Sequence, residues 1–150
     1  MLEQFGRALA PVAEANRLGT ILFQLPPNFK ADPNRLDIFL RDAEKLGFRL
    51  AFEFRHESWF SADTYSALRA HGAALCIAES DDLTTPEEYT APFSCYRFRR
   101  SGYSERDLVA IRAKLKARSA QGDVFAYFKH EDAPDGALRA ARVLEGLRTA

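Results

Sequence analysis

The string AFEFRHESWF carries the residues whose types and spacing best suit chemistry. In a β-strand side chains alternate, so Glu53 and Arg55 would point to one side and Phe52 and Phe54 to the other. If the phenylalanines face a helix layer, Glu53 lies on the opposite face, where a buried carboxylate needs a partner. We predict that Glu53 is a catalytic acid or base, with Arg55 and His56 as ligand-binding groups beside it. The alternative is a salt bridge that only organises the fold.

Two arginines form a second candidate group. Arg97 and Arg99 alternate with Tyr96 and Phe98, so both would project from one face of a strand. The guanidinium fork suits bidentate contacts to phosphate or carboxylate, and we predict that both arginines bind ligand. In the alternative, Arg97 neutralises Glu53 and Arg99 lies in solvent.

Three further positions complete the predicted site. Lys129 and His130 follow the last apolar run, and we predict a ligand-binding lysine and a catalytic acid–base histidine, with a solvated loop as the alternative. Gln24 ends the first apolar run and is predicted to donate its amide to a ligand. Trp59 is predicted to stack on a ligand ring, with packing under the following helix as the alternative. His71 closes a helix, where a favourable contact with the helix dipole is all that we expect.

Neither a metal nor a cofactor is predicted. Suitable metal-ligand types do follow separate strands, but they lack compact spacing, and the nearby basic residues would oppose a cation. These residues are Glu53, His56, Glu79, Asp81 and His130. The chain has no Gly-rich dinucleotide fingerprint, P-loop, nucleophile elbow or CxxC motif.

Composition excludes several classes of partner. The 21 basic and 21 acidic residues give a formal net charge of zero, so no global field attracts a nucleic acid or an anionic membrane. No apolar run is long enough to span a bilayer, and the N-terminus lacks an apolar signal segment. Cys76 and Cys95 lie in apolar runs and are expected to be buried free thiols. These features predict a cytoplasmic protein.

Alternating elements must position the candidate residues. Short apolar runs of strand length cover residues 20–25, 49–54, 73–79, 93–98 and 123–128. Amphipathic segments separate most of them, with Asp32, Ser61 and Ser104 as expected N-caps and Gly47 and Gly122 as expected helix ends. Repeated βα units with nearly continuous apolar strands predict an α/β fold with a parallel sheet covered by helices.

A barrel explains the polar residues better than an open sheet does. All five predicted strands carry polar residues at their carboxyl ends, where a (β/α)₈ barrel builds its site. An open doubly wound sheet uses mainly one switch point. We therefore expect residues 1–150 to form a single domain of five βα units, the C-terminal portion of a TIM barrel.

Four strings carry a family resemblance. They are GTILFQLPPNF, AFEFRHESWF, CYRFRRSGYS and FAYFKHEDAPDGALRAARVL, at residues 19–29, 51–60, 95–104 and 125–144. In this order they resemble the YecE-like proteins, the domain-of-unknown-function family seventy-two. The resemblance implies a TIM barrel and supports Lys129 and His130 as pocket residues. It implies no reaction, because the family's biochemical function is not established.

The resemblance also implies that about three βα units precede residue 1 in the family's barrel. Without them, the first and last strands would present unpaired edges, and the inner face would be uncovered. We expect such a chain to self-associate through its sheet edges.

Two classes of function stay open. The first is an acid–base enzyme, a hydrolase or isomerase, acting on a small polar or anionic ligand at the barrel mouth. The second is a non-catalytic binding or interaction protein, or a remnant without an intact site.

Overall fold

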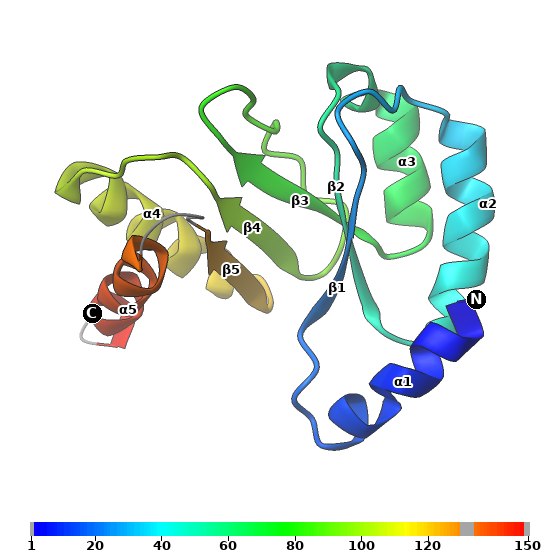
Figure 1. Ribbon diagram of the computed structural model, residues 1–150, viewed down its shortest axis with the longest axis horizontal. Helices are drawn as coiled ribbons and strands as arrows, with labels where there is room; N and C mark the ends of the chain where they lie inside the picture. Colours follow the sequence, from blue (N-terminus) through cyan, green and yellow to red (C-terminus); the bar gives the residue numbers. More distant parts are fainter. Residues whose placement is uncertain (1, 130–133, 149–150) are drawn as a thin grey trace. The chain divides into compact units, whose positions relative to one another are not determined.

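The computed structural model describes residues 2–129 and 134–148, and most of its strands are separated by helices (Figure 1). The strands are β1 (Thr20–Gln24), β2 (Arg49–Glu53), β3 (Ala74–Glu79), β4 (Ser94–Phe98) and β5 (Val124–Phe128). The α-helices are α1 (Leu2–Glu14), α2 (Pro33–Ala43), α3 (Ala62–Ala70), α4 (Glu105–Ser119) and α5 (Asp135–Arg148). Two short 3-10 helices are η1 (Glu44–Leu46) and η2 (Glu57–Trp59).

The sheet has the order β1-β2-β3-β4-β5, and all four neighbouring pairs are parallel. This confirms the α/β fold of five parallel strands in chain order, the arrangement of consecutive strands in a TIM barrel. The link between β3 and β4 contains no helix, as the sequence predicts. It contributes one isolated antiparallel bridge, between Glu79 and Thr84.

Contacts within the chain divide it into two compact units. The first contains Met1–Leu75 and Glu88–Ala91, and the second contains Cys76–Glu87 and Pro92–Ala150. The division falls within β3, whose residues before Cys76 pair with β2 and whose later residues pair with β4. The single-domain organisation stays a prediction.

In the first unit, α2 and α3 lie side by side and pack against the same face of the strands (Figure 1). Leu50, Phe52 and Phe54 of the β2 segment lie in this core with Leu40 of α2 and Leu68 of α3. The ring centroids of Phe52 and Phe54 are 6.2 Å apart, and Phe23 of β1 stacks on Phe52 at 5.2 Å. The phenylalanines of AFEFRHESWF therefore face the helices, as predicted.

In the second unit, α4 and α5 also share one face of their strands. Val124, Ala126 and Phe128 alternate along β5 and line one groove together with residues of both helices. The register pairs Tyr96 with Ala126 and Phe98 with Phe128, so these β4 residues face the same side. Each unit thus keeps two helices on one face of its strands, α2 and α3 in the first and α4 and α5 in the second.

Helix ends follow the predicted signals. Asp32 caps α2 by accepting a hydrogen bond from the backbone N–H of Arg35 at 2.9 Å. Ser104 and Asp107 form a capping box at the start of α4. Helix α2 ends at Ala43 and is continued by η1, after which Gly47 takes the left-handed conformation with φ 70°. Glycine adopts this conformation without the steric cost that a Cβ would add.

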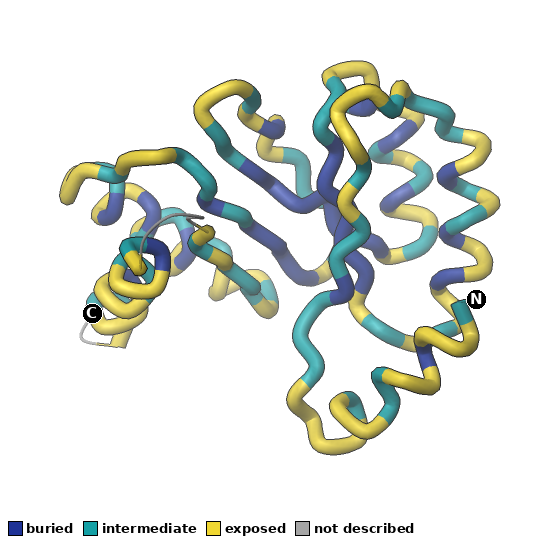
Figure 2. Tube along the Cα trace, in the orientation of Figure 1, coloured by how far each residue is buried: buried dark blue, intermediate teal, exposed yellow. Residues whose placement is uncertain are grey.

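The strand face opposite the helices is less open than the sequence suggests. Ala51 is fully buried, because it is small and is paired on both sides by Leu22 and Ala74. Exposure increases on β5, where Tyr127 is 44% exposed (Figure 2). Cys76 and Cys95 pair in register on β3 and β4, and both are buried thiols, as predicted. None of the described helices is long and apolar enough to cross a membrane.

The aromatic core of the first unit should dominate its stability. Phe52→Ala removes a ring that contacts Phe23, Phe39 and Phe54 and leaves a cavity. We expect a loss of about 3–5 kcal/mol in the free energy of unfolding, measured by urea denaturation. The control Ile38→Ala removes a side chain that is 64% exposed on α2, and it should change stability by less than about 0.5 kcal/mol. Equal effects of the two variants would show that this cluster is not the core.

Candidate functional site

Glu53 ends β2 as a buried carboxylate, with only 1% of its surface exposed. The Nε of Arg55 lies 3.3 Å from its Oε1 and donates a hydrogen bond to it. We predicted that Glu53 lies opposite Phe52 and Phe54 and within salt-bridge reach of Arg55, Arg97 or Lys129, and the contact with Arg55 confirms this. A buried carboxylate is stable only with such compensation. The burial of Glu53 therefore requires a basic partner, and Arg55 supplies it.

Gln24 is brought to the same face by the parallel register. It pairs with Glu53 across β1 and β2, and residues paired in this way point to the same side of a sheet. The next residue, Leu25, continues the pairing, since its backbone N–H donates to the carbonyl oxygen of Glu53 at 3.0 Å. Gln24 is exposed, so its amide can reach a ligand at this end of the sheet.

His56 has a defined hydrogen-bond role that the sequence alone did not show. Its Nδ1 accepts from the backbone N–H of Ser58 at 3.2 Å and caps η2. A nitrogen that accepts cannot carry the proton, so in the neutral ring the proton is on Nε2. His56 is half-buried and directly follows Arg55, and its Nε2–H is therefore the donor that it can offer to a ligand.

Trp59 is buried in the core of the first unit. Its ring stacks on Phe54 with centroids 4.5 Å apart, and its Nε1–H donates to the backbone carbonyl of Phe29 at 2.8 Å. This placement favours the structural alternative left open above, and stacking on a ligand stays a prediction. Trp59 also lines a cavity of about 360 Å³, whose other walls are mainly apolar: Leu22, Phe23, Gln24, Leu25, Phe29, Arg35, Leu36, Phe39 and Phe52.

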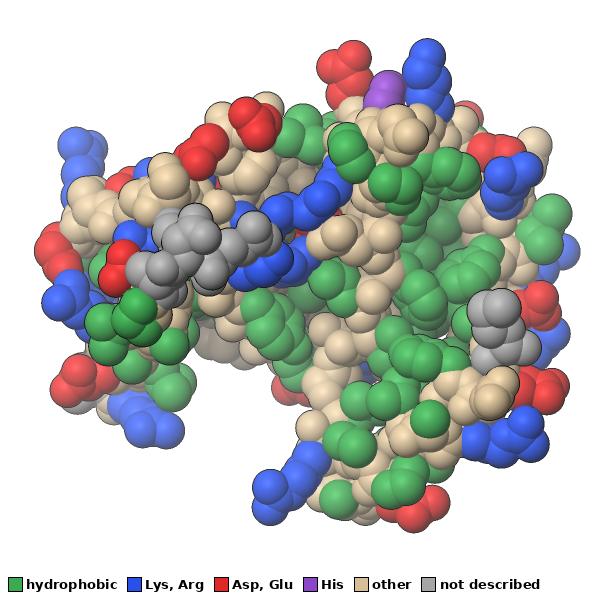
Figure 3. Space-filling model, viewed as in Figure 1, with side chains coloured by type: hydrophobic (Ala, Val, Ile, Leu, Met, Phe, Trp, Pro, Cys, Tyr) green, Lys and Arg blue, Asp and Glu red, His purple; other side chains and the backbone are tan. Residues whose placement is uncertain are grey.

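In the second unit, basic residues occupy the carboxyl ends of β4 and β5. Arg97 is half-buried near the end of β4 and pairs in register with Ala78 and Tyr127. Backbone hydrogen bonds position Arg99 and Lys129. The N–H of Arg99 donates to the carbonyl oxygen of Glu79, and the N–H of Lys129 donates to the carbonyl oxygen of Phe98, both at 2.9 Å. Figure 3 shows Lys and Arg side chains gathered over this end of β4 and β5. The unit therefore presents positive charge where the sequence predicts a ligand.

Tyr103 is a residue of this region that the sequence prediction missed. The guanidinium carbons of Arg100 and Arg139 lie 4.8 and 5.4 Å from its ring centroid, close enough for cation–π attraction. Its hydroxyl accepts from the backbone N–H of Arg100 at 3.2 Å. Burial raises the pKa of the Tyr103 phenol above its usual range. The sequence signal that could have identified Tyr103 was its position in the string CYRFRRSGYS, beside the predicted arginines.

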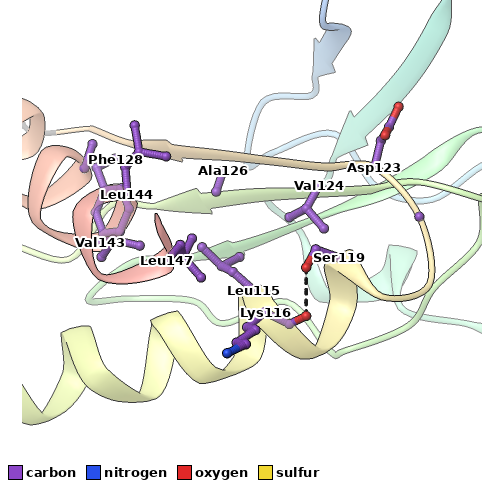
Figure 4. A pocket seen from close by; sticks show the side chains of 12 residues that line it. Leu115, Lys116, Ser119, Asp123, Val124, Ala126, Phe128, Val143, Leu144 and Leu147 are labelled. Carbon is purple, nitrogen blue, oxygen red and sulfur yellow. Dashed lines mark hydrogen bonds between the residues drawn. The ribbon is translucent and has the colours of Figure 1, made fainter. Parts of the chain in front are cut away.

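A groove of about 780 Å³ on the helix side of β5 is distinct from these polar groups. Figure 4 shows Leu115 of α4 with Val143 and Leu147 of α5 around the strand face that carries Phe128. The polar contact drawn there is the hydrogen bond from the Ser119 hydroxyl to the Lys116 carbonyl oxygen, at 2.8 Å. The groove holds none of the predicted site residues.

The predicted residues fall into two groups, one in each unit. Gln24, Glu53, Arg55 and His56 lie together at the carboxyl end of β1 and β2, while Arg97, Arg99 and Lys129 belong to the second unit. His130 lies outside the described residues, so its predicted role is not tested. Within residues 2–129 and 134–148, no three His, Cys, Asp or Glu side chains are grouped to hold a metal ion.

The solved structures that resemble this chain include two DUF72 family proteins. A DUF72 family protein from Thermotoga maritima has 26% sequence identity and a TM-score of 0.85, and the match covers 98% of this chain and 64% of that one. A DUF72 family protein from Enterococcus faecalis has 18% identity and a TM-score of 0.81, covering 99% of this chain and 68% of that one, and shows the fold alone. The chain thus spans about two-thirds of each relative's length. No protein of curated function matches it.

The family profile described as "Protein of unknown function DUF72" matches residues 1–150, the whole length of the chain. The YecE-like resemblance of the four strings agrees with this match. The chain belongs to the DUF72 family of proteins of unknown function.

Proposed function

We propose that this chain binds a small polar or anionic ligand at the carboxyl ends of its strands, and that Glu53 acts there as an acid or base. The observation that carries the proposal is the Glu53–Arg55 pair, a carboxylate almost without exposed surface held at 3.3 Å by a guanidinium. Hydrolysis and isomerisation are the reaction types that this chemistry serves best.

The neighbours of Glu53 support a binding role. Arg55 is 29% exposed and uses one of its five N–H donors on Glu53, so others can reach an anionic oxygen. His56 offers its Nε2–H, and Gln24 offers an amide from the paired strand. These three groups are donors, and a ligand rich in oxygen atoms matches them.

The basic residues of the second unit support an anionic ligand independently. Arg97 and Arg99 suit bidentate contacts to phosphate or carboxylate, and Lys129 is exposed after β5. His130 is proposed as a second acid–base group on the strength of the family resemblance. Cys76 and Cys95 are buried as thiols rather than joined in a disulfide, which supports a reducing compartment, and we propose the cytoplasm.

The alternative function is non-catalytic binding. One observation favours it: the Glu53–Arg55 contact by itself satisfies a buried charge and so explains why the pair exists without any reaction. The two functions predict different roles for the Glu53 carboxylate. An enzyme needs its charge for acid–base chemistry, whereas a binding protein needs that charge only for structure.

Glu53→Gln should reduce ligand binding more than it reduces stability. We expect the variant to lose most of the rise in Tm that wild-type protein shows in a thermal-shift panel of inorganic phosphate, citrate and glucose 6-phosphate, because an uncharged amide no longer holds the Arg55 guanidinium in place for the ligand. The matched control Glu57→Gln changes an exposed glutamate four residues further along and should keep the rise. A Tm rise that is unchanged in Glu53→Gln would contradict a ligand site at this carboxylate.

We also propose self-association of the 150-residue chain. In the described part of the chain, β1 and β5 are the outermost strands, and β5 carries the exposed Tyr127. Sedimentation velocity at increasing concentration should show a growing fraction of dimers or larger species. Tyr127→Lys should weaken the association, whereas Ile38→Lys on exposed α2 should not. A monomer at every concentration tested would refute the proposal.

A further inference from the structure

His71 has both ring nitrogens in contact with carboxylates. Its Nδ1 lies 2.6 Å from Oε2 of Glu44, and its Nε2 lies 3.0 Å from Oδ1 of Asp37. The imidazole is largely shielded, with 11% of the side chain exposed. From the sequence we expected only a contact between His71 and the helix dipole, and that expectation did not include the two carboxylates.

The chemistry of this contact determines the protonation state. A neutral imidazole has one N–H, whereas an ionised carboxylate only accepts hydrogen bonds. Both contacts are hydrogen bonds at the same time only if both ring nitrogens are protonated. The arrangement is therefore that of an imidazolium ion between two carboxylates.

Three elements of the first unit meet at this ion. His71 is the C-cap of α3, Asp37 lies on α2, and Glu44 begins η1. The other carboxylate oxygen of Asp37 lies 2.6 Å from the guanidinium of Arg41. The two negative charges of Asp37 and Glu44 then balance the two positive charges of Arg41 and the protonated histidine. Loss of the histidine proton leaves one negative charge in excess.

We propose that His71 is a proton-dependent latch that holds the end of α3 against α2 and η1. With the imidazolium present, the two ion pairs join the three elements. When the proton leaves, at least one pair becomes a contact between an unprotonated nitrogen and a carboxylate, which repels. The latch does not depend on the proposed function, since none of its residues belongs to the candidate site.

The pH range follows from the directions of the shifts. Hydrogen bonds to Glu44 and then Asp37 raise the pKa of His71, and the hydrogen bond to His71 lowers the pKa of Asp37. A raised histidine pKa stabilises the folded state fully below the unfolded value of about 6.5, and this contribution is lost as pH rises through the folded value. On the acid side, the contribution of Asp37 is lost as pH falls through its lowered pKa.

Nitrogen-15 NMR of the three histidines tests the latch in the wild-type chain. His71 should show two protonated ring nitrogens at pH 6.5 and a titration midpoint above about 6.5. Asp37→Asn should lower that midpoint, whereas Asp42→Asn, which removes an exposed carboxylate of the same helix paired with Lys45, should not. A single neutral tautomer at pH 6.5, or a midpoint insensitive to Asp37→Asn, would overturn the proposal.

Unfolding measurements give an independent readout. The unfolding equilibrium constant of His71→Gln should exceed that of the wild type most strongly near pH 6, by about tenfold per unit of pKa difference, and the ratio should shrink toward pH 9. A ratio that stays constant between pH 6 and 9 would mean that His71 acts only by packing. If His71→Gln does not fold, the wild-type titration still decides.

Discussion

The alternation of side chains along β2 constrains the rest of the candidate site. Phe52 and Phe54 are held in the aromatic core under α2 and α3, so Glu53 between them must point to the other face. There it is buried, and a buried carboxylate without compensation would cost several kcal/mol. Arg55, two residues further on, returns to the same side and supplies the compensating charge at 3.3 Å. Core packing thus dictates where the charge lies.

Parallel pairing extends the same rule to neighbouring strands. Gln24 shares the face of Glu53 because the two are in register, and in the second unit Cys95 and Arg97 of β4 share the faces of Cys76 and Ala78 of β3 for the same reason. On β2, β3 and β4 the face away from the helices carries the small residues Ala51, Cys76 and Cys95, with the polar Glu53 and Arg97 nearer the carboxyl ends. Small residues allow the sheet to pack closely, and the polar residues at the carboxyl ends of the strands are the ones available for ligand chemistry.

Local patterns were enough to predict most of the fold. Apolar runs located the five strands, Asp32 and Ser104 located helix starts, and the parity of AFEFRHESWF predicted the face of Glu53, with Arg55 as one of three candidate partners. The sequence could not predict contacts that depend on how helices dock. The partners of His71 lie 27 and 34 residues away in the chain, and η2 forms because His56 caps it. Trp59 was ambiguous because its stacking on Phe54 depends on the path of that same turn.

The most direct test of this account is a double-mutant cycle on Glu53 and Arg55. Unfolding free energies of wild type, Glu53→Gln, Arg55→Gln and the double variant would be measured by urea denaturation under the same conditions. If Arg55 compensates the buried carboxylate, Arg55→Gln should cost about 3 kcal/mol or more, and the double variant should cost less than the sum by about 1 kcal/mol or more. Additive effects would show that the two side chains are not coupled and would contradict the account.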